Sequence, residues 1–341
     1  MLEVNGESGG QMLRSSLGLS ALLRKPVTIY NIRAKRPNPG LQAQHLTGLN
    51  TLKILSSAKV HGAVKGSMKV VFKPEQFSGG NLNVNIGTAG SVMLLVQAVM
   101  LPSMLKETKL RIFGGTDVPF APSFNYSEKV LFPVLSKMNA RFSASLVSRG
   151  FYPKGNGSIS FKSLPAELPL NPIKLTKKKK VKFVWLFSHS ASLPQEVARV
   201  QALAAKNTLK ELGIEVVERI SSKQQGTSIG SAIDLIAKAG PASIGANALG
   251  ARGKPAEEVG KEAAEKLLKE LNSNAAVDSH LVDQLIPFMA LAKGKSEILC
   301  PELSEHTKNN IAVAEKFLGV KFNSVQENNA VKLWVEGAAF S

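Results

Sequence analysis

The chain has 341 residues, which is more than one small hydrophobic core usually holds, so we expect two domains or one large domain with an insertion. The single cysteine, Cys300, excludes an internal disulfide and a zinc site built on several thiolates. A net charge of +18, from 43 basic and 25 acidic residues, argues for a polyanionic partner, most naturally nucleic acid. The alternative is a lysine-rich surface that is only solvated.

Two further classes of protein are not expected. The sequence holds no uninterrupted apolar run of about 18 residues, so we expect no membrane span. The N-terminal residues lack the basic and apolar regions of a signal peptide, and we expect a cytoplasmic protein.

Apolar periodicity predicts alternating helices and strands through the first part of the chain. Helices are expected at 12–23, 42–56, 91–105 and 122–138. Strands are expected at 27–32, 67–72, 81–86, 109–113, 140–147 and 158–162. This order of elements repeats, which indicates small sheets that are each covered by a pair of helices.

A segment of different character follows, and we interpret residues 177–248 as an inserted small α/β domain. It opens with four consecutive lysines, 177–180, which are either an RNA contact or, as is more usual for such a run, a solvated linker. Its expected elements are strands at 181–187 and 214–219, a helix at 195–212, and apolar runs at 229–237 and 242–246.

The repeated pattern then resumes. Helices are expected at 255–271, 280–291 and 307–318, and strands at 296–299, 320–322 and 330–335. The predicted fold is therefore α/β (α+β), with three repeated units of a small four-stranded sheet plus two helices. Residues 1–176 and 249–341 would form this large repeated domain.

A histidine stands at the start of the last expected helix. Pro301 ends the preceding strand, and apolar residues return at helical spacing over 311–318, with Gly319 at the C-terminal cap. His306 therefore lies at a helix N-terminus, where amide groups and the positive dipole end favour a phosphate anion and disfavour imidazolium. A neutral imidazole there can attack phosphorus, and the alternative is a polar loop residue or a helix cap.

Other polar residues form a second set of candidates. Glu7, in a glycine-rich loop, can hold a divalent metal beside a nucleotide phosphate or simply face the helix dipole. Residues on or beside the first unit's loops either bind phosphate or belong to an ordinary basic surface; they are Arg14, Arg33, Arg36, Gln44 and His45. Asp283 and Gln284 precede an apolar helical run, either as a ribose or phosphate contact or as the exposed start of that helix.

Taken together, these segments resemble the RNA 3′-terminal phosphate cyclase family over nearly the whole chain. The matching pieces are 6–14, 32–36, 39–41, 44–46, 114–117, 149–153, 283–285 and the His306 segment that ends at Ala312. Each piece is short, and their order and spacing make the resemblance specific.

The resemblance implies an ATP-dependent reaction in which a histidine is adenylylated, AMP passes to an RNA 3′-phosphate, and the 2′-hydroxyl closes a 2′,3′-cyclic phosphate. The position that matches the nucleophile is His306, and Glu7 matches an acid linked to Mg²⁺ or Mn²⁺. The positions that match nucleotide-binding residues are Gln97, His280, Leu281, Val282, Asp283 and Gln284. Those that match the RNA phosphate end are Arg14, Arg33, Arg36, Gln44 and His45.

The implied partners are ATP and RNA with a 3′-phosphate, with homo-oligomerisation left open. One rival is a non-enzymatic RNA-binding scaffold in ribosomal RNA processing, a branch that lacks the histidine. A second is a small-molecule transferase of related repeated architecture, against which the +18 charge argues.

Overall fold

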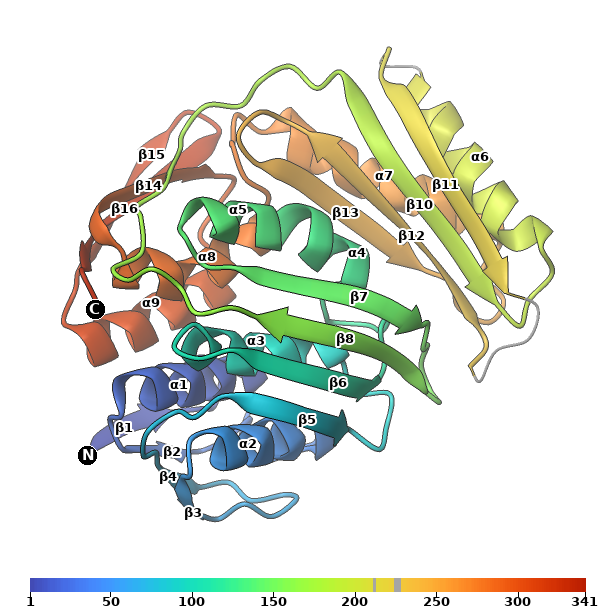
Figure 1. Ribbon diagram of the computed structural model, residues 1–341. Coiled ribbons are helices and arrows are strands. Elements are labelled where there is room, and N and C mark those ends of the chain that lie inside the picture. Colours follow the sequence, from blue (N-terminus) through green and yellow to red (C-terminus); the bar gives the residue numbers. More distant parts are fainter. Residues whose placement is uncertain (211–212, 224–227) are drawn as a thin grey trace.

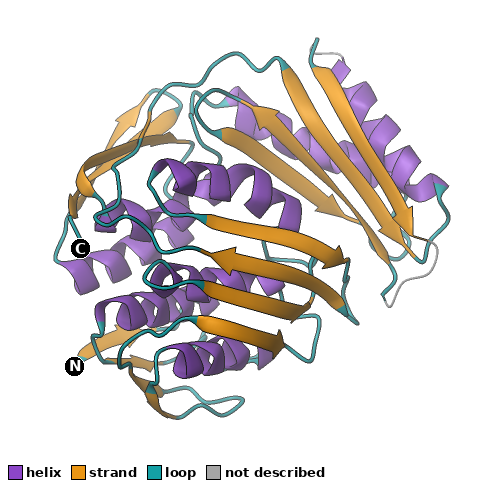
Figure 2. Ribbon diagram, in the orientation of Figure 1, coloured by secondary structure: helices purple, strands orange, loops and turns teal. Residues whose placement is uncertain are grey.

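The computed structural model describes residues 1–210, 213–223 and 228–341 (Figure 1). Its strands form four-stranded sheets, each accompanied by helices (Figure 2). The helix expected over 195–212 is described as far as Lys210, and residues 211–212 lie outside the described part. No helix within the described ranges is long and apolar enough to cross a membrane.

The first repeated unit occupies the N-terminal part of the chain. Its elements are β1 (Leu2–Asn5), α1 (Gly10–Leu23), β2 (Val27–Tyr30), α2 (Ala43–Leu55), β3 (Lys59–His61) and β4 (Val70–Lys73). The strand order is β1-β2-β4-β3, in which β1 and β2 are parallel and the other pairs are antiparallel. The short strand β3 was not predicted, since three residues carry no readable periodicity.

The second unit repeats this arrangement. Its elements are β5 (Gly80–Asn85), α3 (Val92–Ser103), β6 (Thr108–Gly114), α4 (Phe124–Tyr126), a π-helical turn (Ser127–Leu131), α5 (Phe132–Lys137), β7 (Phe142–Ser148) and β8 (Gly157–Ser163). The order is β5-β6-β8-β7, again with only the first pair parallel.

The third unit has the same topology but is interrupted. Its elements are β9 (Lys174–Leu175), α8 (Ser279–Leu291), β14 (Lys293–Cys300), α9 (Glu305–Leu318), β15 (Phe322–Glu327) and β16 (Ala330–Ala338). The order β9-β14-β16-β15, with β9 parallel to β14, matches the other two units. Equal strand order and direction confirm the three repeated units that were predicted.

The interruption lies between β9 and α8. Its elements are β10 (Phe183–Ala191), α6 (Glu196–Lys210), β11 (Glu215–Lys223), β12 (Gly230–Lys238), β13 (Ser243–Leu249) and α7 (Ala256–Asn272). The sheet order β11-β10-β12-β13 differs from that of the repeats. Val259 and Leu267 of α7 belong to the separate core of this sheet, so α7 packs with the insertion although the sequence grouped residues 249–341 with the repeats. The domain limits remain a proposal.

The helices of the three repeated units lie inside the large domain, and their sheets lie on the outside (Figure 1). In β6, for example, Leu110 and Ile112 are buried while Lys109 and Arg111 are exposed, because alternate side chains point to opposite faces of a strand. This arrangement packs α1 against α9 and α9 against α8, and their polar faces build the site described next.

Candidate active site

His306 lies in the first turn of α9, as the sequence predicted. The hydroxyl of Ser304 accepts a hydrogen bond from the Thr307 amide at 3.1 Å, which caps the helix N-terminus. Gly319, with a φ of 71°, ends the helix in the left-handed conformation that glycine tolerates best. Local sequence therefore determines where this helix begins and ends, and His306 is held at its positive end with an exposed side chain.

The surroundings of His306 favour the neutral imidazole. Desolvation of part of the ring, followed by the positive charges of Arg36 and Arg14, lowers the pKa of His306. The ring is consequently neutral over more of the physiological pH range than an ordinary histidine, and a neutral ring nitrogen has the lone pair that a nucleophile needs.

A buried amide ties the helix of His306 to two others. Gln11 of α1 donates from Nε2 to Asp283 Oδ2 of α8 at 2.9 Å and to the His306 carbonyl oxygen at 3.1 Å. Asn310 donates to the Asp283 carbonyl oxygen at 2.6 Å and accepts from Ser15 Oγ at 2.6 Å. The Oε1 atom of Gln11 is buried and has no hydrogen-bond partner among the described residues, so it can accept from a bound ligand.

Sequence reasoning gave Gln11 and Asn310 no role, although both fall within the matched segments. For Gln11 the available signal was an amide at the start of a mostly apolar helix, because a buried amide needs hydrogen-bond partners. Asn310 had no such signal, since α9 is polar throughout residues 305–310.

A small cavity of about 50 Å³ lies between α1, α3, α8 and α9. It brings together Gln97, Asp283 and Gln284, which the sequence assigned to the nucleotide, with Arg14, which the sequence assigned to RNA. Gln97 Nε2 donates to Gln284 Oε1 at 2.7 Å. Burial raises the pKa of Asp283 to about 6 and lowers the pKa of Arg14 to about 10.

The remaining predicted nucleotide residues lie differently. The side chains of Leu281 and Val282 are fully buried in the hydrophobic core, so they pack rather than line the cavity. His280 is exposed near the start of α8, and its carbonyl oxygen accepts from Gln284 Nε2 at 2.8 Å.

Side chains with phosphate-binding chemistry meet at the glycine start of α1. Gly9 precedes the helix with a φ of 149° and provides no side-chain cap, so the amides of the first turn face outward. A Cβ on Gly9 would lie 3.2 Å from Arg36 Nη2, and one on Gly10 would lie 3.2 Å from Arg14 Nη1 and would clash with His45 Nε2. Glycine is therefore required for this approach, and the arrangement suits an anion.

His45 contributes a neutral donor to this anion site. Its Nδ1 accepts from the Gln42 amide at 3.2 Å, so the proton lies on Nε2, which faces Gly10. Burial, followed by the charges of Arg14 and Arg33, lowers the pKa of His45 to about 3.

Arg33 and Gln44 shape the same region without converging on Gly9 and Gly10. Arg33, in a left-handed conformation with a φ of 55°, donates to the Gly40 carbonyl oxygen at 3.0 Å and to that of Asn38. Gln44 Oε1 accepts from the Ser91 amide at 3.0 Å, at the N-terminus of α3. Both contacts hold loops in place.

Comparisons with known proteins identify the family of the chain. The model of the family described as RNA 3′-terminal phosphate cyclase matches residues 5–324. The chain belongs to the RNA 3′-terminal phosphate cyclase family. The RNA 3′-terminal phosphate cyclase of Pyrobaculum neutrophilum is 43% identical over 341 residues and is aligned over 98% of this chain and 97% of the relative. That of Archaeoglobus fulgidus is 44% identical, with 94% of this chain and 98% of the relative aligned.

A divalent metal is implied for the cyclase family, and Glu7 fits the role of ligand. Its partly exposed carboxylate pairs with Lys35 at 2.9 Å. The hydrogen bond and the charge of Lys35 lower the pKa of Glu7, so this carboxylate is ionised. One carboxylate together with substrate phosphates is a common way to hold Mg²⁺.

A second acidic group does not fit a metal. Ligand atoms of Asp117, His189 and Asp234 lie within 4.8 Å of one another. However, Asp117 already accepts from Arg149 and Thr116, and the carboxylate of Asp234 accepts from Ser123 and Asn125. These oxygens are occupied by protein donors that join the insertion to the second unit of the cyclase fold.

Proposed function

We propose that the protein converts an RNA 3′-terminal phosphate to a 2′,3′-cyclic phosphodiester, with ATP cleaved to AMP and pyrophosphate. The observation that carries this proposal is an accessible, neutral His306 at a helix N-terminus near the charges of Arg14 and Arg36. Those charges can stabilise the negative charge that accumulates on phosphate oxygens during transfer.

In the first step a ring nitrogen of His306 attacks the α-phosphorus of ATP. A nitrogen–phosphorus bond forms, the bond from the α-phosphorus to the bridging oxygen breaks, and pyrophosphate leaves with that electron pair. The lowered pKa of His306 keeps the attacking lone pair free. Gln11 holds the His306 backbone, which limits the motion of the first turn of α9.

In the second step an oxygen of the RNA 3′-phosphate attacks the adenylyl phosphorus, and the bond to His306 breaks. The 2′-oxygen then attacks the 3′-phosphorus, loses its proton, and expels AMP. A bare 3′-phosphate is a poor electrophile, whereas AMP is a stabilised leaving group. The 2′-hydroxyl is already beside the phosphorus, and its absence from DNA restricts the ring closure to RNA.

The cavity of about 50 Å³ is too small for a nucleotide, which usually needs a site of several hundred Å³. We expect ATP binding to separate the Gln97–Gln284 pair and to give the buried Oε1 of Gln11 a donor. Mg²⁺ or Mn²⁺ at Glu7 would supply positive charge beside the phosphates. The metal would replace Lys35 as the partner of the Glu7 carboxylate.

The deciding experiment is incubation with ATP labelled at the α-phosphate, followed by denaturation and detection of label on the protein. We expect acid-labile, alkali-stable label in the wild type and none in His306→Ala. His61→Ala is the matched control, since His61 is an exposed histidine on β3. No label in the wild type, with RNA binding intact, would support the scaffold alternative. Label retained in His306→Ala would mean that another residue is the nucleophile.

A further inference from the structure

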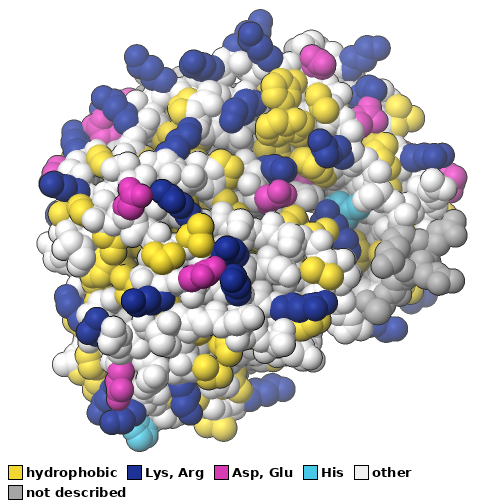
Figure 3. All heavy atoms as spheres, in the orientation of Figure 1, with side chains coloured by type: hydrophobic (Ala, Val, Ile, Leu, Met, Phe, Trp, Pro, Cys, Tyr) yellow, Lys and Arg dark blue, Asp and Glu magenta, His cyan; other side chains and the backbone are white. Residues whose placement is uncertain are grey.

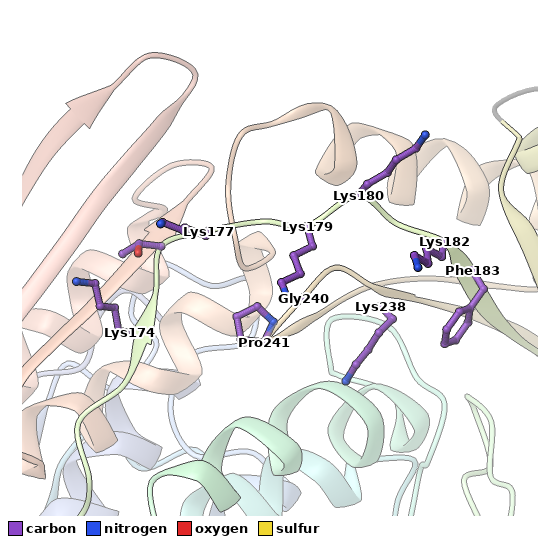
Figure 4. A pocket seen from close by; sticks show the side chains of 10 residues that line it. Lys174, Lys177, Lys179, Lys180, Lys182, Phe183, Lys238, Gly240 and Pro241 are labelled. Carbon is purple, nitrogen blue, oxygen red and sulfur yellow. The ribbon is translucent and has the colours of Figure 1, made fainter.

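A basic groove lies where the insertion joins the third repeated unit. Six lysines line it, Lys174, Lys177, Lys179, Lys180, Lys182 and Lys238, and no acidic side chain of the described residues does. Its volume is about 740 Å³, much larger than that of the cavity beside His306. Figure 4 shows Lys179 reaching toward Gly240, with Phe183 and Lys238 extending from the neighbouring strands β10 and β12.

The groove lysines have few counter-ions. Lys174 pairs with Glu297 at 3.6 Å, while the described residues give no ion pair to Lys177, Lys179, Lys180, Lys182 or Lys238. Holding like charges together is unfavourable, and a polyanion relieves that repulsion by displacing mobile counterions. Figure 3 shows the same imbalance more widely, with Lys and Arg side chains spread over this face and few Asp or Glu.

Lys178, within the lysine run, forms hydrogen bonds inside the protein. Lys178 Nζ donates to the carbonyl oxygens of Leu271 and Ser273, at the C-terminal end of α7. A cation there satisfies carbonyls that the helix leaves unpaired. The run is thus anchored through Lys178, with Lys177, Lys179 and Lys180 left exposed, which is more than a plain solvated linker requires.

The groove and His306 lie at the same end of the third unit. Strands β9 and β14 are parallel neighbours, with Lys174 paired to Glu297 and Leu175 to Ile298. The lysine run follows β9, and α9 with His306 follows β14, so both leave the sheet at the same edge.

We infer that this groove binds the single-stranded RNA segment that precedes the terminal phosphate. The inference rests on the proposed function, because the RNA segment placed in the groove belongs to the same molecule whose 3′-phosphate reaches His306. Phosphates would lie along the lysines, and Phe183, which is partly exposed, offers one ring on which a base can stack. RNA is favoured over an acidic peptide because it supplies both regular phosphates and flat bases.

The test compares two 3′-phosphorylated RNAs, one of three nucleotides and one of about twenty, with a variant carrying Lys179→Gln, Lys180→Gln and Lys182→Gln. We expect KM for the long RNA to rise about tenfold and its salt dependence to fall by about two units of slope, since each lost single-strand contact removes about 0.7. KM for the short RNA, kcat and protein–AMP formation should stay unchanged.

The matched control carries Lys53→Gln, Lys73→Gln and Lys106→Gln. These substitutions remove the same charge, but the three exposed lysines lie far along the first two units. Lys53 is in the last turn of α2, Lys73 ends β4, and Lys106 follows α3. An equal effect in this control would overturn the groove, since net charge alone would explain it. Two results with the groove variant would also overturn the inference. One is an unchanged KM for the long RNA, and the other is weaker binding of an acidic peptide with unchanged binding of RNA.

Direct binding separates this inference from the proposed function. Fluorescence anisotropy of the long RNA needs no catalysis, so it tests the groove even if no protein–AMP forms. Weaker binding in the groove variant without adenylylation would retain the groove and reject the enzyme mechanism. Normal adenylylation and cyclisation by the wild type, with RNA binding unchanged in the groove variant, would retain the enzyme mechanism and reject the groove.

Discussion

Arg149 donates hydrogen bonds from Nη1 to both carboxylate oxygens of Asp117, at 2.9 and 3.1 Å, and the Asp117 side chain is fully buried. The same carboxylate contacts His189 Nε2 of the insertion at 3.1 Å. Burial by itself would raise the pKa of Asp117, but the charge of Arg149 and the contact with His189 more than offset it, and the pKa lies below its ordinary value. The contact between Asp117 and His189 therefore joins the second unit to the inserted sheet.

Removing Arg149 should destabilise the protein strongly, because it leaves Asp117 buried without its main counter-ion. We expect Arg149→Met to lower the free energy of unfolding by about 3–5 kcal/mol, measured by urea denaturation. The double variant with Asp117→Asn should lose less than the sum of the single variants, since the residues interact directly.

The control for this prediction is Arg141→Met. Arg141 forms an exposed pair with Glu167 at 3.2 Å, and exposed pairs contribute at most about 1 kcal/mol. Equal losses in the two arginine variants would show that burial of the Arg149–Asp117 pair contributes nothing.

The contacts of Asp117, Arg149 and His189 could not be predicted from the sequence. The segments 114–117 and 149–153 were recognised as family segments, but their role was not predictable because their partners are distant in the chain. The Asn125–Asp234 bond, for example, spans 109 residues. By contrast, the position of His306 depends on Ser304 and Gly319, whose capping chemistry is local and readable.

The same distinction applies within the site. The sequence selected one group of five residues, Arg14, Arg33, Arg36, Gln44 and His45. Three of them, Arg14, Arg36 and His45, approach Gly9 and Gly10. The sequence could not show that Arg33 and Gln44 contact other backbone groups, those of Gly40 and Ser91, because side-chain direction depends on the folded loop. Nor could it show that α7 packs on the inserted sheet, since helix periodicity does not name the surface that the helix covers.

The rate of protein–AMP formation should have an acidic limb below pH 6.5, the ordinary pKa of histidine. Burial and nearby positive charge lower the pKa of His306, so the nucleophile stays deprotonated to a lower pH and loses activity only as pH falls through that lowered value. Arg36→Gln removes one of the charges and should move the limb to higher pH. Single-turnover labelling across pH 4–8 measures both.

A limb that does not move in Arg36→Gln would belong to another group. Asp283, whose pKa burial raises to about 6, is the candidate, and Arg36 is not among the groups that shift its pKa. In that case Asp283→Asn would remove the acidic limb, and Arg36→Gln would leave the limb at the same pH as in the wild type.

Gly10→Ala should separate the two halves of the reaction. The new Cβ would clash with His45 Nε2 and press on Arg14, so the anion site at the start of α1 would be distorted. We expect cyclisation of RNA 3′-phosphate to fall by about 10²-fold, since small misplacements near a reacting group have effects of this size. Protein–AMP formation should persist, because the displaced groups are assigned to the RNA end.

Gly48→Ala is the control for this substitution. Gly48 also lies in a helix, but an added Cβ would meet only Ala98 at an ordinary distance of 3.5 Å, so activity should be kept. If Gly10→Ala abolishes protein–AMP formation as well, the start of α1 binds ATP phosphates rather than the RNA end.

Gln11→Met should slow protein–AMP formation by about tenfold. It removes the donor that Asp283 Oδ2 and the His306 carbonyl oxygen share, and an unmet buried hydrogen bond costs about 1–3 kcal/mol. Ser15→Ala provides the comparison, because it removes a hydrogen bond to Asn310 in the same cluster without touching Asp283 or His306. Single-turnover labelling should show a clear loss for Gln11→Met and a near-normal rate for Ser15→Ala. If both variants are slowed equally, the packing of the cluster matters and the direct link from Gln11 to the first turn of α9 does not.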